Sequence, residues 1–277
     1  MPTGDLLADF EAAFATELGR SKRVYRIGAT GPCVLVCHEL PGFSPAVAGF
    51  ARHLAAHGFR VSVPVLVGTP GAAPTAVELV KSTLKVCISR EFNLFAAGRS
   101  SPVVEWLRAF GKSEHVRCGG PGIGVVGMCF TGGFALALAT DPHVLAPVLS
   151  QPAIPVRIAL RAFSPRSIDV PETGLQAVRR RLDADPGLCV LGYRFSHDAK
   201  VPEERFAWLR ERLGDRFVGV TIDSSPGNQG GYSTDAHSVL TEQLVPQALD
   251  EVVRLFRRQL LGSVDAAPAG SRTGTTT

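Results

Sequence analysis

A cysteine between a short apolar run and a helical pattern is the side chain best placed to do chemistry. In residues 124–140, GVVGMCFTGGFALALAT, Cys129 follows the apolar run and precedes a segment rich in Ala and Leu. A nucleophile on a sharp strand-to-helix turn needs small neighbours, because its strained backbone brings the flanking positions close to adjacent elements. Three glycines meet that need: Gly127, Gly132 and Gly133. The pattern predicts a nucleophilic thiol, and the alternative is a buried cysteine that merely fits beside glycines.

The residue after the cysteine has a predicted role of its own. At such a turn the first amide of the following helix, that of Phe130, points at the oxyanion of a bound substrate. The helix dipole at the same end favours the thiolate of Cys129. The local sequence therefore predicts a nucleophile and one oxyanion donor side by side.

An acid and a histidine follow the cysteine in the order that a nucleophile elbow requires. Asp198 comes after the run LCVLGYRFS, and His237 comes after FVGVTI. Both are expected in loops beyond the carboxyl ends of strands, where open α/β sheets bind ligands. Asp198 could instead cap a helix, and His237 could be an exposed loop residue. His197 is a rival base, and Asp223 and Asp235 are rival acids.

The same stretch also matches the dinucleotide-binding pattern GxGxxG, through Gly122, Gly124 and Gly127. That fingerprint needs a strand first and then a glycine turn that opens a helix. Here the glycines fall inside the apolar run, and polar KSEHVRCGGP stands before them. A nucleotide-binding oxidoreductase therefore stays only as an alternative, as does a non-catalytic binding protein.

The elements that must position these residues alternate along the chain. Continuous apolar runs of the kind that form strands buried on both faces lie at residues 33–37, 59–65, 123–127, 145–149, 188–192 and 217–222. Helical patterns lie between or after them, at residues 46–57, 102–110, 130–139, 203–213 and 246–260. This alternation predicts an α/β fold, with a mostly parallel twisted sheet and helices on both faces.

Three further regions complete the predicted organisation. Residues 66–101 and 151–186 interrupt the alternation and are expected to line the site as excursions from one domain, residues 1–262. Residues 263–277 are small, polar and aperiodic, which predicts a disordered tail. Near the N-terminus, the apolar residues between Leu6 and Leu18 stand at helix-like spacing.

Composition narrows the classes of function. The net charge of +4 is spread over 277 residues without basic blocks, which argues against a nucleic-acid partner. No apolar stretch approaches the roughly 20 residues of a membrane span, and the start lacks a secretory pattern, so we expect a cytoplasmic protein. The six cysteines show no CxxC pair or zinc-ligand spacing, which predicts no metal. Cys33 and Cys37 are expected to be core residues.

Four motifs in this order resemble the dienelactone hydrolase family of α/β-hydrolases, over roughly residues 34–237. They are HELPG at 38–42, GMCFTGG at 127–133, DAKVP at 198–202 and AHS at 236–238. The resemblance implies an α/β-hydrolase fold without metal or organic cofactor. It also implies Cys129 as nucleophile, His237 as general base and Asp198 as the acid that orients the histidine.

The resemblance adds residues around the thiol. It implies that Glu39 contacts the resting thiol and helps to control its ionisation, and that the amide of Leu40 is the second oxyanion donor. Thr131 replaces a glycine of the best-known members. Thr241 stands where members that cleave dienelactone carry an arginine that holds the substrate carboxylate. Arg90 and Arg99, in the first excursion, are candidate substitutes.

The sequence thus predicts a cysteine-dependent hydrolase of small carboxylic esters or lactones that works through a thioester acyl-enzyme. Acyl transfer on the same triad is the alternative within enzymes. The partner is a small-molecule ester or lactone, and the physiological substrate and oligomeric state stay open.

Overall fold

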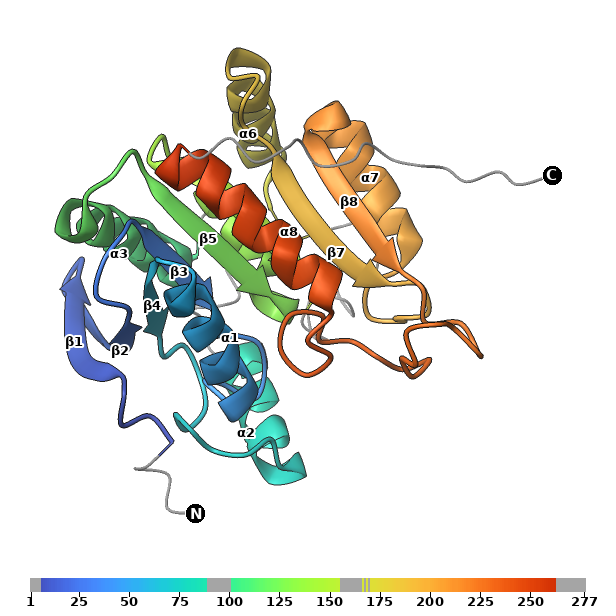
Figure 1. The fold of residues 1–277 in the computed structure, drawn as a ribbon, viewed down its shortest axis with the longest axis horizontal. Coiled ribbons are helices and arrows are strands. Elements are labelled where there is room, and N and C mark those ends of the chain that lie inside the picture. The colour runs from blue at the N-terminus through green and yellow to red at the C-terminus, as the bar shows by residue number, and fades with distance from the viewer. Residues whose placement is uncertain (1–5, 89–100, 155–165, 167, 169, 263–277) are drawn as a thin grey trace.

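The described residues build one eight-stranded sheet with helices on both faces (Figure 1). The computed structural model describes residues 6–88, 101–154, 166, 168 and 170–262. The strands are β1 (Glu11–Glu17), β2 (Arg20–Ile27), β3 (Cys33–Cys37), β4 (Arg60–Pro64), β5 (Ile123–Met128), β6 (Val144–Ser150), β7 (Val190–Phe195) and β8 (Phe217–Ile222). Their order in the sheet is β1-β2-β4-β3-β5-β6-β7-β8. The mostly parallel α/β fold predicted from the sequence is confirmed.

The parallel part of the sheet consists of β4, β3, β5, β6, β7 and β8. Every residue of β3, β5 and β7 is buried. The continuous apolar sequences of β3 and β5 predict this, whereas β7 also buries Arg194. In register, Cys37 pairs with Gly127, and Met128 pairs with Ser150. The loops that follow β3, β5 and β6 therefore start at one edge of the sheet, and this shared edge is where the predicted site residues must meet.

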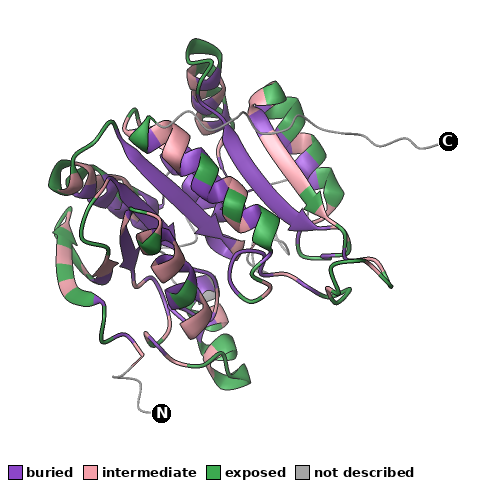
Figure 2. Ribbon diagram, in the orientation of Figure 1, coloured by how far each residue is buried: buried purple, intermediate pink, exposed green. Residues whose placement is uncertain are grey.

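The N-terminal segment is not a helix, so the helix-like spacing near the start of the chain was misleading. β1 and β2 form an antiparallel hairpin, and β2 continues antiparallel to β4. The two turn residues, Leu18 and Gly19, both have positive φ, which matches the right-handed twist of a two-residue hairpin. Phe14 is 75% exposed, because β1 is an edge strand and much of it faces solvent (Figure 2). The spacing of the apolar residues between Leu6 and Leu18 therefore does not come from the buried face of a helix.

The helices divide into two layers around the sheet. They are α1 (Pro45–Ala56), α2 (Ala76–Ile88), α3 (Pro102–Cys118), α4 (Gly132–Leu138), α6 (Glu172–Ala184), α7 (Glu203–Leu213) and α8 (Pro246–Phe256). Helices α1 and α8 cross the near face in Figure 1. Helices α3, α4, α6 and α7 cover the far face. Helices α2 and α6 lie in the two predicted excursions, and α3 runs about two turns beyond its predicted end at residue 110.

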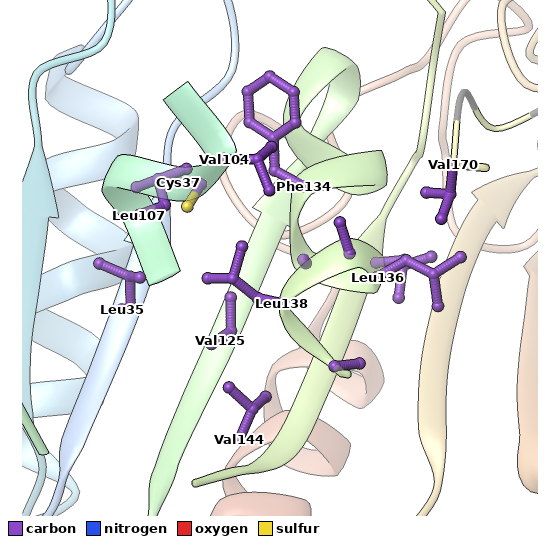
Figure 3. Close-up of a cluster of buried hydrophobic side chains, with 14 of the residues drawn as sticks. Leu35, Cys37, Val104, Leu107, Val125, Phe134, Leu136, Leu138, Val144 and Val170 are labelled. Carbon is purple, nitrogen blue, oxygen red and sulfur yellow. The ribbon is translucent and has the colours of Figure 1, made fainter. Parts of the chain in front are cut away.

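Each helix layer has its own buried cluster. On the far side, Leu35 of β3 and Val125 of β5 lie near Leu107 of α3 and Leu138 of α4 (Figure 3). On the near side, Phe50 of α1 belongs to a second cluster. The sheet is thus held from both faces, which keeps the carboxyl ends of its strands in fixed positions.

Within the part of the chain that the structure describes, no helix is long and apolar enough to cross a membrane. The predicted disordered tail, residues 263–277, lies outside the described residues, as do residues 89–100 of the first predicted excursion.

Candidate active site

Cys129 occupies a strained turn between β5 and α4. Its φ is +54°, an unusual value for a residue with a side chain, and residues 129–131 form a single 3₁₀ turn before α4 begins. A Cβ at Gly127 would lie 2.2 Å from the carbonyl oxygen of Thr131, and a Cβ at Gly132 would lie 2.6 Å from the Cβ of Pro152. A side chain at either position would therefore clash with neighbouring atoms, so the glycines leave the room that the turn needs, as the sequence pattern predicts.

Thr131, the residue that departs from the glycine of the best-known members, ties the turn together. Its Oγ1 accepts a hydrogen bond from the amide of Met128 at 2.7 Å. Its hydroxyl proton lies within reach of the carbonyl oxygens of Cys37 (2.7 Å) and Met128 (2.9 Å). The side chain is fully buried, so these bonds are shielded from water. Thr131 thus links the elbow to the end of β3.

His237 and Asp198 lie together, although 39 positions separate them. Nδ1 of His237 is 2.6 Å from Oδ2 of Asp198, and the side chains are 12% and 3% exposed. The second carboxylate oxygen accepts from the amide of Lys200 at 2.9 Å, which fixes the orientation of Asp198. Nε2 of His237 is buried and forms no hydrogen bond with any described residue. That nitrogen can therefore exchange a proton.

The environment of His237 favours its protonated form. Burial alone lowers the pKa of the imidazole, but the hydrogen bond to Asp198 and the sulfur of Cys129 outweigh it and raise the pKa to about 10. Cys129 and His237 line the same cavity. The structure thus joins the imidazole of His237 to the carboxylate of Asp198 beside the cavity that Cys129 also lines.

The rival candidates lie elsewhere or have other partners. His197 is exposed, and its ring is bonded to Ser196. Asp223 is exposed and accepts from the amide of Ser225, and Asp235 is exposed and accepts from Ser233. None of these three is brought against His237 by a hydrogen bond, whereas Asp198 is.

Glu39 is buried, and three side chains hold its carboxylate. Gln151 donates to Oε2 at 2.9 Å, Ser238 donates to Oε2 at 2.7 Å, and Thr241 donates to Oε1. Burial raises the pKa of Glu39, and the bonds from Thr241 and Ser238 act in the opposite direction. No hydrogen bond joins Glu39 to Cys129 within the described residues, so the expected contact with the resting thiol is not among its bonds.

Gln151 and Thr241 acquire roles that the sequence did not indicate. Gln151 has a positive φ of 36°, and its Oε1 accepts from the amide of Val239 at 3.2 Å. It therefore connects the end of β6 with the loop that carries His237. Thr241, where an arginine was expected to hold a substrate carboxylate, instead donates its hydroxyl proton to Glu39. Thr241 therefore helps to hold the Glu39 carboxylate and is not among the described residues that line the cavity.

The loop that carries Leu40 is braced by a neutral histidine. His38 is completely buried, and burial lowers its pKa to about 4. Its Nε2 accepts from the amide of Leu66 at 3.0 Å, so the ring proton is on Nδ1, which donates to the carbonyl of Glu39 at 2.9 Å. Ser82 of α2 donates to the carbonyl of Pro41 at 2.7 Å. These bonds fix the backbone on both sides of the proposed donor amide of Leu40.

Arg205 is a buried cation near the site that sequence reasoning missed. Its Nη1 donates to the carbonyls of Pro152 (2.9 Å) and Lys200 (2.7 Å). In the loop that contains Pro152, the amide of Ala153 donates a hydrogen bond to the carbonyl of Cys129 at 2.9 Å. The loop that contains Lys200 also carries Asp198. Burial lowers the pKa of Arg205 to about 10, while the charges of Asp198 and Cys129 oppose the shift. Its place on an ordinary amphipathic helix offered no signal for this role.

A cavity of about 670 Å³ opens over these residues, a volume typical of small-molecule sites. Its walls include Cys129, His237, Glu39 and the proposed oxyanion donors Leu40 and Phe130. Apolar side chains from α2 and from the loop after β6 complete one side: Leu79, Val86, Ala153 and Ile154. Among the described wall residues, three carboxylates stand against one ammonium group, and these residues are Glu39, Asp235, Glu242 and Lys200.

Three other predicted features can be placed. Arg90 and Arg99 lie outside the described residues. Gly124 and Gly127 lie inside β5, where a Cβ at Gly124 would come 2.8 Å from the ring of Phe256, so these glycines serve packing and not a phosphate loop. The described residues that could jointly offer ligands to a metal are Cys33, Glu114 and Cys118, and they lie away from this cavity.

Comparisons with known proteins agree with this architecture. The family model of the dienelactone hydrolase family matches residues 15–260. No curated protein sequence matches the chain. A Klebsiella pneumoniae structure assigned as a dienelactone hydrolase is 14% identical and has a TM-score of 0.58, with 92% of this chain and 99% of that chain covered. An esterase from Pyrococcus furiosus is 13% identical, with a TM-score of 0.58 and 94% of both chains covered.

A third solved structure, an α/β serine hydrolase without a lid from Xanthomonas campestris, is 16% identical, with a TM-score of 0.54. The superposition covers 94% of this chain and 97% of that chain. At such identities the three structures establish the shared α/β-hydrolase fold.

Proposed function

Because this chain belongs to the dienelactone hydrolase family, a family of hydrolases, we propose that it cleaves small, uncharged carboxylic esters or lactones through a thioester on Cys129. The observation that carries the proposal is the strained turn at Cys129, which shares one cavity with His237, itself bonded to Asp198 at 2.6 Å. The three groups match the roles of nucleophile, base and orienting acid.

In the first half of the proposed reaction, the thiolate of Cys129 attacks the carbonyl carbon of the ester. The amides of Leu40 and Phe130 stabilise the developing oxyanion. When the tetrahedral intermediate collapses, the carbon–oxygen bond to the leaving group breaks and protonated His237 gives that oxygen its proton. The raised pKa of His237 supports this step, because the ring holds a proton at neutral pH. The products are a thioester on Cys129 and an alcohol; a lactone keeps its hydroxyl on the acyl chain.

In the second half, neutral His237 takes a proton from water, which attacks the thioester carbonyl. The carbon–sulfur bond then breaks, the acid is released, and the imidazolium and thiolate are restored. Asp198 keeps Nδ1 of the ring protonated and Nε2 directed at the reacting groups, a role supported by its bond to His237.

The preference for uncharged substrates rests on the cavity wall. Thr241 is bonded to Glu39 and offers no positive charge, and among the described wall residues the three carboxylates of Glu39, Asp235 and Glu242 outnumber two cations, the ammonium of Lys200 and the imidazolium of His237. A substrate carboxylate would meet a predominantly negative surface, which is unfavourable. The apolar side chains of α2 suit an acyl chain instead.

Trapping the acyl-enzyme tests the nucleophile. The protein is mixed with a p-nitrophenyl ester, quenched in acid within milliseconds to seconds, and digested with trypsin. Residues 118–157 form one tryptic peptide, which contains both Cys118 and Cys129. The adduct is therefore mapped in Cys118→Ala protein, in which Cys129 is the one cysteine of this peptide. An acyl group on another residue, or unchanged hydrolysis in Cys129→Ala, overturns the proposal.

Two further measurements test water as the acceptor and the substrate charge. In heavy-oxygen water, hydrolysis places one heavy oxygen in the acid product, whereas a product joined to another nucleophile supports acyl transfer. p-Nitrophenyl butyrate is compared with p-nitrophenyl hemisuccinate, which has a similar chain but ends in a carboxylate. A higher kcat/KM for the anionic ester contradicts the assignment of uncharged substrates.

A further inference from the structure

A second group of reactive side chains lies at the other end of β3. Cys33 is the first residue of β3, and Cys118 is the last residue of α3. Their sulfur atoms and a carboxylate oxygen of Glu114 all lie within 4.8 Å of one another. Cys33 is fully buried and Cys118 is partly exposed. We call these residues the Cys33–Cys118 cluster.

The cluster does not suit a metal ion, because its carboxylate is already engaged. Glu114 accepts hydrogen bonds from Arg26 (2.7 Å), Arg117 (2.6 Å) and Ser62 (2.5 Å). It is only 2% exposed, so these bonds are shielded from water. Two guanidinium groups at the same carboxylate would also repel a cation. The local charge favours a negatively charged ligand or side chain.

The two thiols are unequal. The hydrogen bond from Cys33 and the charge of Arg117 lower the pKa of Cys118 to about 6, although burial opposes the shift. The pKa of Cys33 is raised by the same hydrogen bond and by its burial. Arg60 adds a third guanidinium, which donates to the carbonyl of Cys118 at 3.5 Å. Near neutral pH the cluster therefore holds one thiolate, on the more accessible sulfur, beside one thiol.

We propose that Cys118 and Cys33 form a peroxide-sensitive pair that closes to a disulfide. The thiolate of Cys118 attacks one oxygen of a hydroperoxide; the oxygen–oxygen bond breaks, and Cys118 becomes a sulfenic acid while hydroxide or alkoxide leaves. The sulfur of Cys33 then attacks the sulfenic sulfur, its proton joins the departing hydroxyl, and water leaves. Two thiols are oxidised by two electrons, and the hydroperoxide is reduced.

The surrounding backbone allows the sulfurs to approach. Cys118 is followed by Gly119 and Gly120, whose φ values of +74° and +89° belong to glycine-favoured regions. The end of α3 can therefore adjust more easily than Cys33, which is fixed inside the sheet. The cluster lies at the amino end of β3, whereas Glu39 and Cys129 follow the carboxyl ends of β3 and β5. Closure of the disulfide should leave ester hydrolysis unchanged.

Peptide mapping after treatment with hydrogen peroxide tests the pair. Cys33 and Cys37 share the tryptic peptide 27–52, and Cys118 and Cys129 share the peptide 118–157. The experiment therefore uses Cys129→Ser protein, in which Cys118 is the one thiol of its peptide. We expect the two peptides to become linked, and dithiothreitol to release them. A peroxide-treated sample in which Cys118 stays reduced, or is oxidised without any link, overturns the proposal.

Cys37 provides a matched control, because it is buried on the same strand four residues later. In the Cys129→Ser background, Cys37→Ala should retain the link, and Cys33→Ala should abolish it and leave Cys118 as sulfinic or sulfonic acid. If the link between the two peptides survives in Cys33→Ala, Cys33 is not the partner of Cys118 and the proposal is wrong. Fragmentation of the linked peptide between residues 33 and 37 identifies the bonded sulfur without any substitution in β3, so the test does not depend on the folding of the variants.

Discussion

Among the described residues, the two ends of the central strands each hold a cysteine near a positive charge, but only Cys129 also has an imidazole and a cavity beside it. Cys129 lies near an imidazole, which can accept and return a proton, and it opens on a cavity of about 670 Å³. Cys118 lies near guanidinium groups, which stabilise a thiolate but do not give up their protons. The difference shows that charge alone makes a thiol reactive, whereas catalysis also requires a base that cycles and space for substrate.

The largest expected effect separates the two cysteines directly. Cys129→Ala should lower kcat/KM for a p-nitrophenyl ester by on the order of 10⁴-fold or more, because the nucleophile is lost. Cys118→Ala, at the end without a base, should keep the wild-type rate. Steady-state kinetics on both purified variants make the comparison. Equal loss in both would remove the functional distinction between the two ends of the strands.

The base and its acid provide the next test. Asp198→Asn should lower kcat by about 10²–10⁴-fold, because the ring of His237 loses the carboxylate that orients it. The same change should lower the pKa of His237, since the bond to Asp198 raises it. The pH profile of Cys129 alkylation by iodoacetamide reports that shift. Asp223→Asn and Asp235→Asn are the controls, and either of them matching Asp198→Asn would reassign the acid.

The two clusters should also respond to pH with opposite signs. His237 has a folded pKa of about 10 against a usual 6.5, so its contribution to stability is complete below pH 6.5 and disappears as the pH rises towards 10. Cys118 has a folded pKa of about 6 against a usual 9, so its contribution is complete above pH 9 and disappears as the pH falls through 6.

Urea unfolding between pH 6 and 9 measures both slopes. The free energy lost in His237→Gln should decrease as the pH rises, and the free energy lost in Cys118→Ala should increase. The difference for His237 should reach a few kcal/mol at its maximum, since one pKa unit corresponds to about 1.4 kcal/mol, and the difference for Cys118 should be smaller, because solvent screens a partly exposed charge. Slopes of the same sign in the two variants would contradict the assigned charges.

A smaller effect tests how the elbow is held. Thr131→Val should destabilise the fold by about 1–3 kcal/mol, because the amide of Met128 and the carbonyl of Cys37 lose their buried partner. Thr131→Ser retains the hydroxyl and should recover most of the loss. Thermal unfolding of the pair provides the measurement, and a valine variant as stable as the wild type would show that the hydroxyl is dispensable.

The smallest expected effect concerns Arg205. The shorter side chain of lysine does not bring its ammonium to the position from which Nη1 bonds the carbonyls of both Pro152 and Lys200. Arg205→Lys should therefore lower kcat about tenfold, as expected for the loss of one hydrogen bond of roughly 1.4 kcal/mol. KM should change less than kcat, because the bonds of Arg205 hold the backbone beside Cys129 and Asp198, although Ala153 and Lys200 of the same loops also line the cavity. Arg210→Lys, on the same helix but exposed, is the control. A change confined to KM would assign Arg205 to substrate binding.

The parts of the fold that the sequence predicted well are those in which burial is uniform. CVLVC and IGVVGM are completely buried, and such continuous apolar runs have few alternatives to a central parallel strand. The hairpin β1–β2 was missed because apolar residues of two different kinds follow one another along the chain. Buried residues of the loop come first and the exposed Phe14 of the edge strand comes next, so that their combined spacing resembles that of a helix. A pattern rule based on one buried face fails where the sheet itself ends.

The sequence by itself indicated which side chains could take part in chemistry: a cysteine whose glycine neighbours leave room for a sharp turn, and an acid and a histidine that follow later strands. These features are readable because turn geometry and strand order act over short stretches of chain. Only the tertiary structure decided that Asp198 pairs with His237, that Thr241 bonds to Glu39 and that Arg205 joins two loops. Such contacts arise where parallel strands bring distant loops to one edge, and no local pattern encodes which side chains meet there.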